Sequence, residues 1–216
     1  MVIYMEKVQI NYRYENKYLI PIEDIYDVKK KLLLNGYKIK HRPNKINNIY
    51  FDVDDRSLIE NIEGERVRKK NRLRWYGDFH EIKQPTLEVK IKSGNLGKKN
   101  RFKIKQDFKL ENLDQIVKYI NDRFNNNNSK TLHPKTINRY HRDYFVFGNH
   151  RITLDSNLTY FVPYNLKIKK TERIGVVEIK YSNENNESKK ILHLLDLKLS
   201  KYSKFVNGNN FSKLYL

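Results

Sequence analysis

The chain contains no cysteine among its 216 residues. This absence excludes disulfide bonds and every metal site built on thiolate ligands, and it is compatible with a reducing compartment. The six histidines show no paired spacing of the kind that zinc sites use. We therefore expect them at structural or surface positions.

Long apolar runs are also missing. The first 17 residues, MVIYMEKVQINYRYENK, hold no apolar stretch of signal-peptide length, and no segment approaches the roughly 20 apolar residues of a membrane-spanning helix. We expect a soluble, cytoplasmic protein. The length and the lack of an internal repeat predict one domain over residues 1–216.

Negative charge is scarce. Lys and Arg number 44 against 25 Asp and Glu, which gives a formal net charge of +19 at pH 7. Such an excess indicates a polyanionic partner: nucleic acid, an anionic membrane surface or a phosphorylated small molecule. A lysine-rich proteome would also raise the lysine content, but it would not explain where the arginines lie.

Periodicity predicts an α+β chain. Strand-like alternation covers residues 9–20, 46–52, 67–76, 86–92, 101–105, 144–147, 151–159 and 175–181. Helical spacing covers about 21–34, 113–124, 133–142 and 190–199. The strands are separated by glycines and short polar loops, which is typical of an antiparallel meander.

Six strands share one design, with charges on one face and apolar side chains on the other. The charged positions are Arg13, Glu15 and Lys17; Arg72 and Arg74; Glu88, Lys90 and Lys92; Arg101, Lys103 and Lys105; Arg151 and Asp155; and Glu178 and Lys180. Like charges directly opposed on neighbouring strands destabilise a sheet. A basic ladder repeated over six strands therefore indicates an anion that neutralises it.

Two arrangements fit this design. In an ordinary sheet, the charged faces point to water. In the other, an antiparallel barrel of about eight strands turns a highly charged face into its lumen, with a few helices on the outside. Lys and Arg would then surround a chain of phosphates. The glutamates would either hold Mg²⁺ or Mn²⁺ or pair with the cations.

The strand motifs resemble the VTC domain, the polyphosphate polymerase domain of the vacuolar transporter chaperone, within the CYTH or triphosphate tunnel metalloenzyme superfamily. The matching segments, in family order, are Arg-Tyr-Glu-Asn-Lys-Tyr (13–18), Tyr-Phe-Asp (50–52), Arg-Leu-Arg-Trp-Tyr (72–76), Glu-Val-Lys (88–90), Tyr-His-Arg (140–142), Arg-Ile-Thr-Leu-Asp (151–155), Glu-Ile-Lys-Tyr (178–181) and Ser-Lys-Phe (203–205), followed by Gly208. Hydrolytic relatives typically begin Glu-x-Glu-x-Lys. Here Arg13 takes the place of the first glutamate, which resembles the polymerase branch.

The resemblance implies transfer of the ATP γ-phosphate onto growing inorganic polyphosphate, with no protein nucleophile. The residues implied in phosphate clamping and catalysis are Arg72, Arg74, Lys90, Arg142 and Arg151. Those implied in substrate binding are Arg13, Lys17, Lys92, Lys103, Lys180, Lys201 and Lys204, and the implied ligands of Mn²⁺ or Mg²⁺ are Glu178, Glu15 and Glu88. ATP and pyrophosphate or polyphosphate are the expected partners.

Two other functions stay open. One is a tunnel hydrolase acting on tripolyphosphate, a nucleoside triphosphate or an RNA 5′ end. The other is a noncatalytic module that binds polyphosphate, or nucleic acid as the less favoured ligand. The resemblance also implies an integral membrane protein as a partner, which would place the chain peripherally at the inner face of a membrane.

Overall fold

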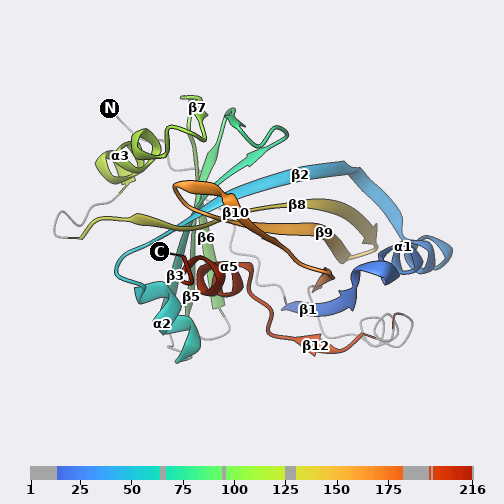
Figure 1. Cartoon of the computed structure of the whole chain (residues 1–216). Coiled ribbons are helices and arrows are strands. Elements are labelled where there is room, and N and C mark those ends of the chain that lie inside the picture. The colour runs from blue at the N-terminus through green and yellow to red at the C-terminus, as the bar shows by residue number, and fades with distance from the viewer. Residues whose placement is uncertain are drawn as a thin grey trace.

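The computed structural model describes residues 14–63, 67–93, 96–124, 130–181, 195 and 197–215. Its strands are β1 (Tyr14–Pro21), β2 (Lys38–Asp52), β3 (Val67–Tyr76), β4 (Glu81–Ile82), β5 (Thr86–Ser93), β6 (Leu96–Lys103), β7 (Phe108–Lys109), β8 (His133–Phe147), β9 (His150–Val162), β10 (Asn165–Thr171), β11 (Ile174–Tyr181) and β12 (Leu199–Ser200). The helices are the 3-10 turn η1 (Ile22–Asp24), α1 (Ile25–Leu34), α2 (Arg56–Ile62), α3 (Leu113–Phe124) and α5 (Lys204–Ser212). Figure 1 shows their arrangement.

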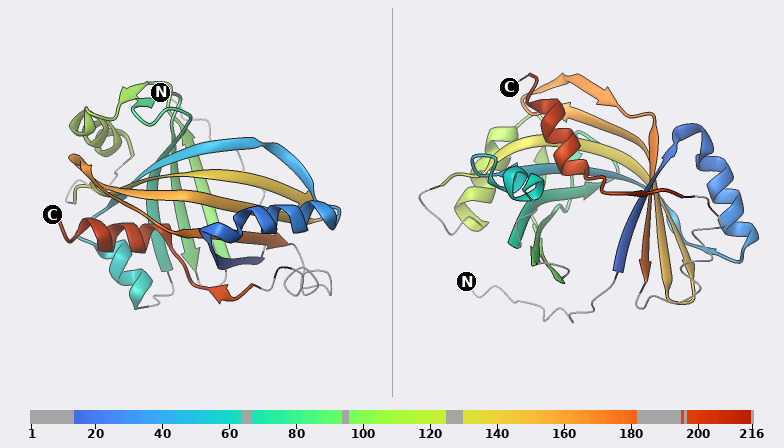
Figure 2. Two further views of the ribbon diagram at one scale, coloured as in Figure 1. Left: turned by 45° about the vertical axis from the view of Figure 1, so that its right-hand side comes forward. Right: turned by 90° about the horizontal axis from the view of Figure 1, so that it is seen from below.

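A curled antiparallel sheet of ten strands forms the body of the molecule (Figures 1 and 2). Its order is β12-β1-β11-β9-β8-β2-β3-β5-β6, with β10 paired to β9, while β4 and β7 form a separate pair. This confirms the antiparallel, barrel-like α+β fold with flanking helices. Within the described ranges the end strands β12 and β6 do not pair with each other, so "barrel" is an approximate description.

The outer face of the sheet is apolar where helices cover it. At one end, Tyr18 and Ile20 of β1 pack with Val28 and Leu32 of α1. At the other end, α3 and the β4–β7 pair cover a second cluster, in which Trp75 is fully buried. The alternation of strand side chains leaves the opposite, charged positions for the inner face.

Helix α5 lies against the inner face instead. Its Phe205 contacts Tyr50, and its Phe211 joins a cluster with Tyr140 and Tyr160. A Cβ atom at Gly208 would lie 2.7 Å from a side-chain atom of Thr136 and 2.7 Å from one of Tyr160. Only glycine allows this close approach, so Gly208 sets how deeply α5 sits in the curve of the sheet.

Two sequence-based predictions of secondary structure need comment. Residues 133–142 were expected to form a short helix, but they are the first part of the long strand β8. There Thr136, Ile137 and Asn138 are all buried, because α5 covers one face of the strand and the α3 side covers the other, so the period-2 pattern is lost. Most of the helix predicted at 190–199 lies outside the described residues, but at its end residues 197 and 198 are not helical and Leu199 begins strand β12. Helix α5 was not predicted. No helix in the described part of the chain is long and apolar enough to span a membrane.

Candidate anion-binding site

The inner face of β3, β5 and β6 carries charged side chains in aligned rows. The register places Arg72 opposite Glu88, and Glu88 opposite Arg101. Directly opposed residues of an antiparallel pair project to the same side of the sheet, which brings these charges within reach of one another. Alternation along β3 adds Arg74 and Lys70 to the same face.

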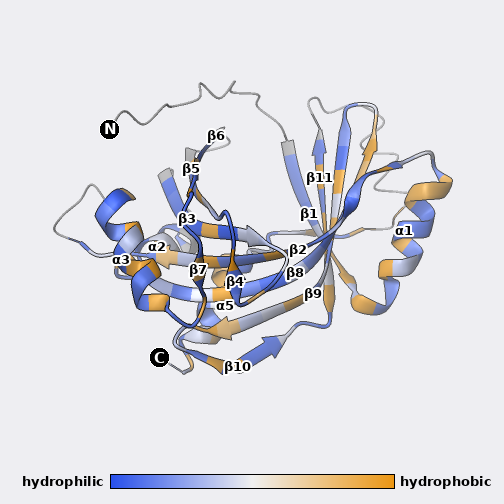
Figure 3. Cartoon of the chain, turned by 90° about the horizontal axis from the view of Figure 1, so that it is seen from above, coloured by the Kyte–Doolittle hydropathy of each residue, from blue (hydrophilic) through white to orange (hydrophobic). Residues whose placement is uncertain are grey.

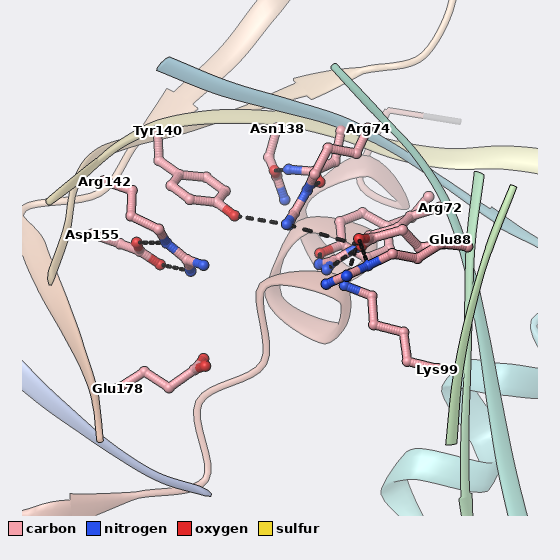
Figure 4. Close-up of polar contacts among 12 residues, drawn as sticks. Arg72, Arg74, Glu88, Lys99, Asn138, Tyr140, Arg142, Asp155 and Glu178 are labelled. Atoms are coloured by element: carbon pink, nitrogen blue, oxygen red, sulfur yellow. Dashed lines mark hydrogen bonds and ion pairs between the residues drawn. The ribbon is translucent and has the colours of Figure 1, made fainter. Parts of the chain in front are cut away.

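Glu88 is the centre of the first group of charges, which we call the Glu88 group (Figure 4). Arg72 donates to the Glu88 carboxylate from Nε at 2.6 Å and from a terminal nitrogen at 2.5 Å. Lys99 makes a very short ion pair with the other carboxylate oxygen, and Arg101 approaches that oxygen to 3.4 Å. Arg74 lies 3.9 Å away. Four cations therefore surround one carboxylate.

The charges of the Glu88 group determine its ionisation. Burial alone would raise the pKa of Glu88, but Arg72, Arg74 and Lys99 outweigh burial and hold that pKa well below its usual value. Burial, together with the charge of Arg72, lowers the pKa of Lys99 to about 7. One carboxylate cannot balance four cations, so the group retains positive charge. The Arg101 side chain is 66% exposed, which opens that charge to solvent.

Lys70 extends the positive surface toward α5. Its ammonium group donates to the Ser203 hydroxyl at 3.3 Å and lies 5.4 Å from the centre of the Phe205 ring. Burial and the neighbouring cations lower the pKa of Lys70 to about 7. Ser203 also caps α5, because its hydroxyl accepts from the backbone N–H of Val206 at 3.4 Å. Lys70 therefore connects β3 to the start of the helix.

The second group, the Asp155 group, ties β9, β8 and α5 together. Arg142 holds the fully buried Asp155 carboxylate with two bonds of 2.5 and 2.7 Å, and Lys204 adds a third of 2.7 Å. Both cations also lie near the ring of Tyr140, at 5.3 and 4.9 Å from its centre. The Tyr140 hydroxyl accepts from Arg74 at 3.1 Å, which links this group to the Glu88 group.

The third group, the Glu178 group, lies on β1, β11 and β5. Lys180 bridges Glu178 at 2.6 Å and Glu15 at 3.5 Å. Glu15 also lies 3.5 Å from Lys17 and 3.8 Å from Lys90. Burial and their mutual repulsion oppose ionisation of the two carboxylates, but the lysines, with Arg142 adding for Glu178, keep both pKa values lowered. The Lys90–Glu15 pair connects β5 to β1 across the curve of the sheet.

The structure brings together most of the residues chosen from the sequence. Arg72, Arg74, Lys90, Arg142, Lys17, Lys180, Lys204, Glu15, Glu88 and Glu178 fall in the three groups described above. Arg151 lies on the same face, opposite Lys180. Lys103 is exposed on β6 and Lys201 is exposed before α5. Arg13 lies outside the described residues, and for Lys92 only its place in β5, opposite Arg68, is described.

Sequence reasoning missed part of the site. Lys70 was overlooked because the alternation on β3 was followed only from Arg72 onward, although the same period reaches back to Lys70. Lys99 and Tyr140 were not chosen, and Asp155 was noted in its strand but given no role. The register between neighbouring strands brings these residues to the site, and the periodicity along a single strand does not reveal that register.

Only two of the three predicted metal ligands lie together. Glu15 and Glu178 share Lys180, whereas Glu88 belongs to a separate group filled with cations. The described residues contain no cluster of three or more acidic, histidine or cysteine side chains that could hold a metal ion. Mg²⁺ needs only one or two carboxylates when phosphate oxygens complete its shell. The Glu15–Glu178 pair supplies that number of carboxylates, with the Lys180 ammonium group bridging them.

Comparison with known proteins gives a consistent result. The family model described as the VTC domain matches residues 12–213. No curated protein sequence matches the chain. Among solved structures, the PH1012 protein from Pyrococcus horikoshii OT3 is 15% identical with a TM-score of 0.53, and the alignment covers 88% of this chain and 96% of that one.

Two further structures are described as candidate nucleotide cyclases. One, from Vibrio parahaemolyticus, is 13% identical with a TM-score of 0.53, covering 91% of this chain and 97% of its own. The other, from Hippeastrum, is described as having a dominant triphosphatase activity; it is 13% identical with a TM-score of 0.50, covering 91% of this chain and 94% of its own. At these identities the likeness concerns the fold alone.

Proposed function

The chain belongs to the VTC domain family, and from that premise we propose that it is a polyphosphate polymerase that transfers the γ-phosphate of ATP to growing inorganic polyphosphate. The observation that carries the proposal is the Glu88 group, in which four cations share one carboxylate on the inner face. A surface on which positive charges outnumber negative charges in this way suits a chain of phosphates. It is also linked through Tyr140 to the further cations of the Asp155 group, Arg142 and Lys204.

In the proposed reaction, a terminal oxygen of the acceptor polyphosphate forms a bond to the γ-phosphorus of ATP. The bond from that phosphorus to the oxygen bridging the β- and γ-phosphates breaks, and ADP leaves. The acceptor is then one phosphate longer. No protein nucleophile is needed, and catalysis comes from positioning and from stabilising the charge that develops on the transferred group.

The residues of the site have different roles in binding and positioning the substrate, according to where they lie. Arg72 and Arg74 are held by Glu88 and by Asn48 and Tyr140, so their guanidinium groups are pre-oriented for phosphate oxygens. Among the described residues Arg151 makes no ion pair, which leaves its charge for a substrate. Arg142 and Lys204 are committed to Asp155, and we assign them to positioning β8, β9 and α5.

Glu15 and Glu178 would hold Mg²⁺ or Mn²⁺ together with phosphate oxygens, and the ion would neutralise part of the phosphate charge. Lys90, Lys180 and Lys17 keep Glu15 ionised, and Lys180 and Lys17 keep Glu178 ionised, so both carboxylates are in the charged form that a metal ion requires. Lys90 and Lys103 would line the path of the phosphate chain. If the chain works beside an integral membrane protein, as the family resemblance implies, that protein would receive the polyphosphate product.

The testing experiment is to incubate the purified protein with ATP and Mn²⁺, with and without pyrophosphate as primer. Products are resolved on a gel, treated with an exopolyphosphatase, and assayed for free phosphate in parallel. We expect polymer that the exopolyphosphatase degrades. Free phosphate without polymer would overturn the polymerase assignment in favour of a triphosphatase, which retention of the Glu15–Glu178 pair would support. If neither polymer nor free phosphate forms, a noncatalytic binding module is favoured.

Variants sharpen this assay. Arg151→Ala is expected to abolish polymer formation while the melting temperature changes little, because Arg151 makes no ion pair within the described chain. Lys105→Ala removes an exposed cation next to the same sheet and serves as the matched control. Equal losses of polymer in the two variants would contradict a specific role for Arg151.

A further inference from the structure

The outer face of the sheet has an uncovered strip between its two helical layers. Figure 3 shows α1 and α3 at opposite ends of the sheet, with β10 between them coloured mostly as hydrophilic. The register carries one row of residues through four strands of this strip: Asn47 on β2, Arg139 on β8, Thr159 on β9 and Thr171 on β10. These side chains point away from the Glu88 group.

Two adjoining pockets hollow this strip. One has a volume of about 390 Å³ and the other about 250 Å³, and they share Arg139 and Thr159. The first also touches Lys167 and Lys169 of β10, and the second touches Lys45 of β2. We call Lys45, Arg139, Lys167 and Lys169 the outer cations. All four are exposed.

Within the described part of the chain, none of the outer cations forms an ion pair with a carboxylate. Asp78 is near enough to Lys45 for that charge to help lower the Asp78 pKa, after the backbone hydrogen bonds that lower it most. The acidic residues nearby in the sequence also have other partners. Asp78 accepts from the backbone N–H groups of His80 and Glu81 at 2.7 and 3.0 Å. Glu111 pairs with His80, Asp143 with Lys29 at 2.7 Å, and Glu172 with Lys170 at 3.1 Å.

Several contacts show that the strip is preorganised and cationic. The Arg139 guanidinium lies 5.4 Å from the centre of the Phe79 ring, which holds it in place. The hydroxyls of Thr159 and Thr171 are 3.0 Å apart on the pocket wall. Burial, and then the charges of Lys45 and Arg139, lower the pKa of His141 on the same strip, against the charge of Asp143, which raises it. Two of the outer cations therefore act on one ring of the strip.

We propose that this strip is a second anion-binding site that takes a condensed phosphate chain, either as free polyphosphate or as the triphosphate of a nucleotide. A single phosphate cannot contact cations on all these strands, because three strand spacings of about 4.8 Å span roughly 14 Å. Single-stranded nucleic acid would need aromatic rings for base stacking. The phenylalanine and tyrosine rings that line the two pockets, Phe79, Phe161 and Tyr140, are only 6%, 7% and 2% exposed. The site stands on its own charges and does not depend on the chemistry of the inner face.

Site-resolved footprinting tests the proposal on the unmodified protein. Lysine acetylation is measured by mass spectrometry with and without tripolyphosphate, ATP or a long polyphosphate. We expect protection of Lys45, Lys167 and Lys169, with no protection of Lys40 or Lys105, which are exposed elsewhere. Protection by ATP as well as tripolyphosphate would assign the site to the triphosphate group, and protection by long polyphosphate alone to the free polymer. Uniform protection of all five lysines would overturn the proposal.

Charge-reversal variants provide a second, independent measurement. In an Arg72→Ala/Arg74→Ala background, which weakens binding on the inner face, Arg139→Glu/Lys169→Glu is compared with Lys40→Glu/Lys105→Glu. Both pairs change the net charge by the same amount. We expect the first pair to weaken polyphosphate binding roughly tenfold or more and the control pair to weaken it much less. Equal weakening, or tighter binding of an RNA with the same number of phosphates, would overturn the proposal.

Discussion

Glu88 shows how one buried acid can assemble a basic surface. It is 4% exposed and it neutralises only one of the four cations around it, so it brings the cations together without cancelling their charge. Alternation along β3 and β5 predicted that Arg72, Arg74 and Glu88 would share a face. It did not predict that Lys99 and Arg101 would meet Glu88, because that depends on the register of β6 against β5.

Replacing Glu88 by Gln should destabilise the protein by about 3–5 kcal/mol, because four cations would be left without a counter-ion. Urea denaturation measures the change in free energy of unfolding. Glu81→Gln is the matched control, since its pair with Lys109 is 4.0 Å long and largely exposed and should contribute below about 1 kcal/mol.

The same variant tests the site as well as its stability. Tripolyphosphate should raise the melting temperature of Glu88→Gln more than that of the unmodified protein, because an added anion can replace the lost carboxylate. Unchanged stability in Glu88→Gln, or an equal response to tripolyphosphate, would show that Glu88 does not serve as the counter-ion of this group.

Lys70 and Lys99 make anion binding depend on pH near neutrality. Burial lowers both pKa values to about 7, whereas both lysines remain protonated to about 10.5 in the unfolded chain. Between these limits the unfolded state binds more protons, so their contribution to stability rises with pH above about 7. Phosphate binding has the opposite dependence, because it favours the protonated amines.

Tripolyphosphate affinity should therefore fall between about pH 6.5 and pH 8.5, as calorimetric titration would measure. The double substitution Lys70→Met/Lys99→Met should flatten this part of the profile while lowering affinity at the acidic end. A profile that keeps its full slope in the double variant would assign the pH dependence to other groups.

At the scale of elements, the apolar pattern along the sequence predicted the secondary structure correctly where one face of an element is exposed. Helix α3 shows an apolar stripe of Leu113, Ile116 and Ile120, and the structure has it at the predicted residues. Strand β8 and helix α5 are different. The first half of β8 is buried on both faces, and α5, with the sequence KFVNGNNFS, has a weak apolar pattern and is held by tertiary contacts. Neither could be found from periodicity alone.

The docking of α5 can be tested at its closest approach to the sheet. Gly208→Ala should cost about 1–3 kcal/mol of stability, because the new methyl group would overlap Thr136 and Tyr160. Asn210→Ala, at an exposed position of the same helix, should have little effect or stabilise slightly. Thermal unfolding compares the two. If Gly208→Ala were as stable as the control, the close packing of α5 would be contradicted.

At the scale of the whole molecule, the excess of positive charge is the feature that the sequence reported most directly. The net charge of +19 predicted a polyanionic partner, and the ordered motifs predicted the family, which the match over residues 12–213 confirms. The division of the charge between an inner face and an outer strip was not predicted. It follows from which parts of the outer face α1, α3 and the β4–β7 pair leave uncovered.

Tripolyphosphate at about 100 times its dissociation constant should raise the melting temperature by roughly 5–10 °C, because it binds only the folded state and relieves cation repulsion. Differential scanning calorimetry would measure the shift. Sodium chloride at the same ionic strength is the control, since it screens the charges without bridging them. An equal shift with sodium chloride would mean that screening alone accounts for the effect.

In the ranges that the structure describes, the end strands β12 and β6 of the sheet do not pair, and this has a mechanical consequence. The circumference of a barrel closed by hydrogen bonds is fixed. Here the Lys90–Glu15 ion pair, at 3.8 Å, joins β5 to β1 across the curve of the sheet. A pair of this kind weakens as ionic strength rises. The separation of β5 and β1 should therefore respond to salt, and on the proposed function a long polymer would be able to enter or leave along the side of the sheet without being threaded from one end.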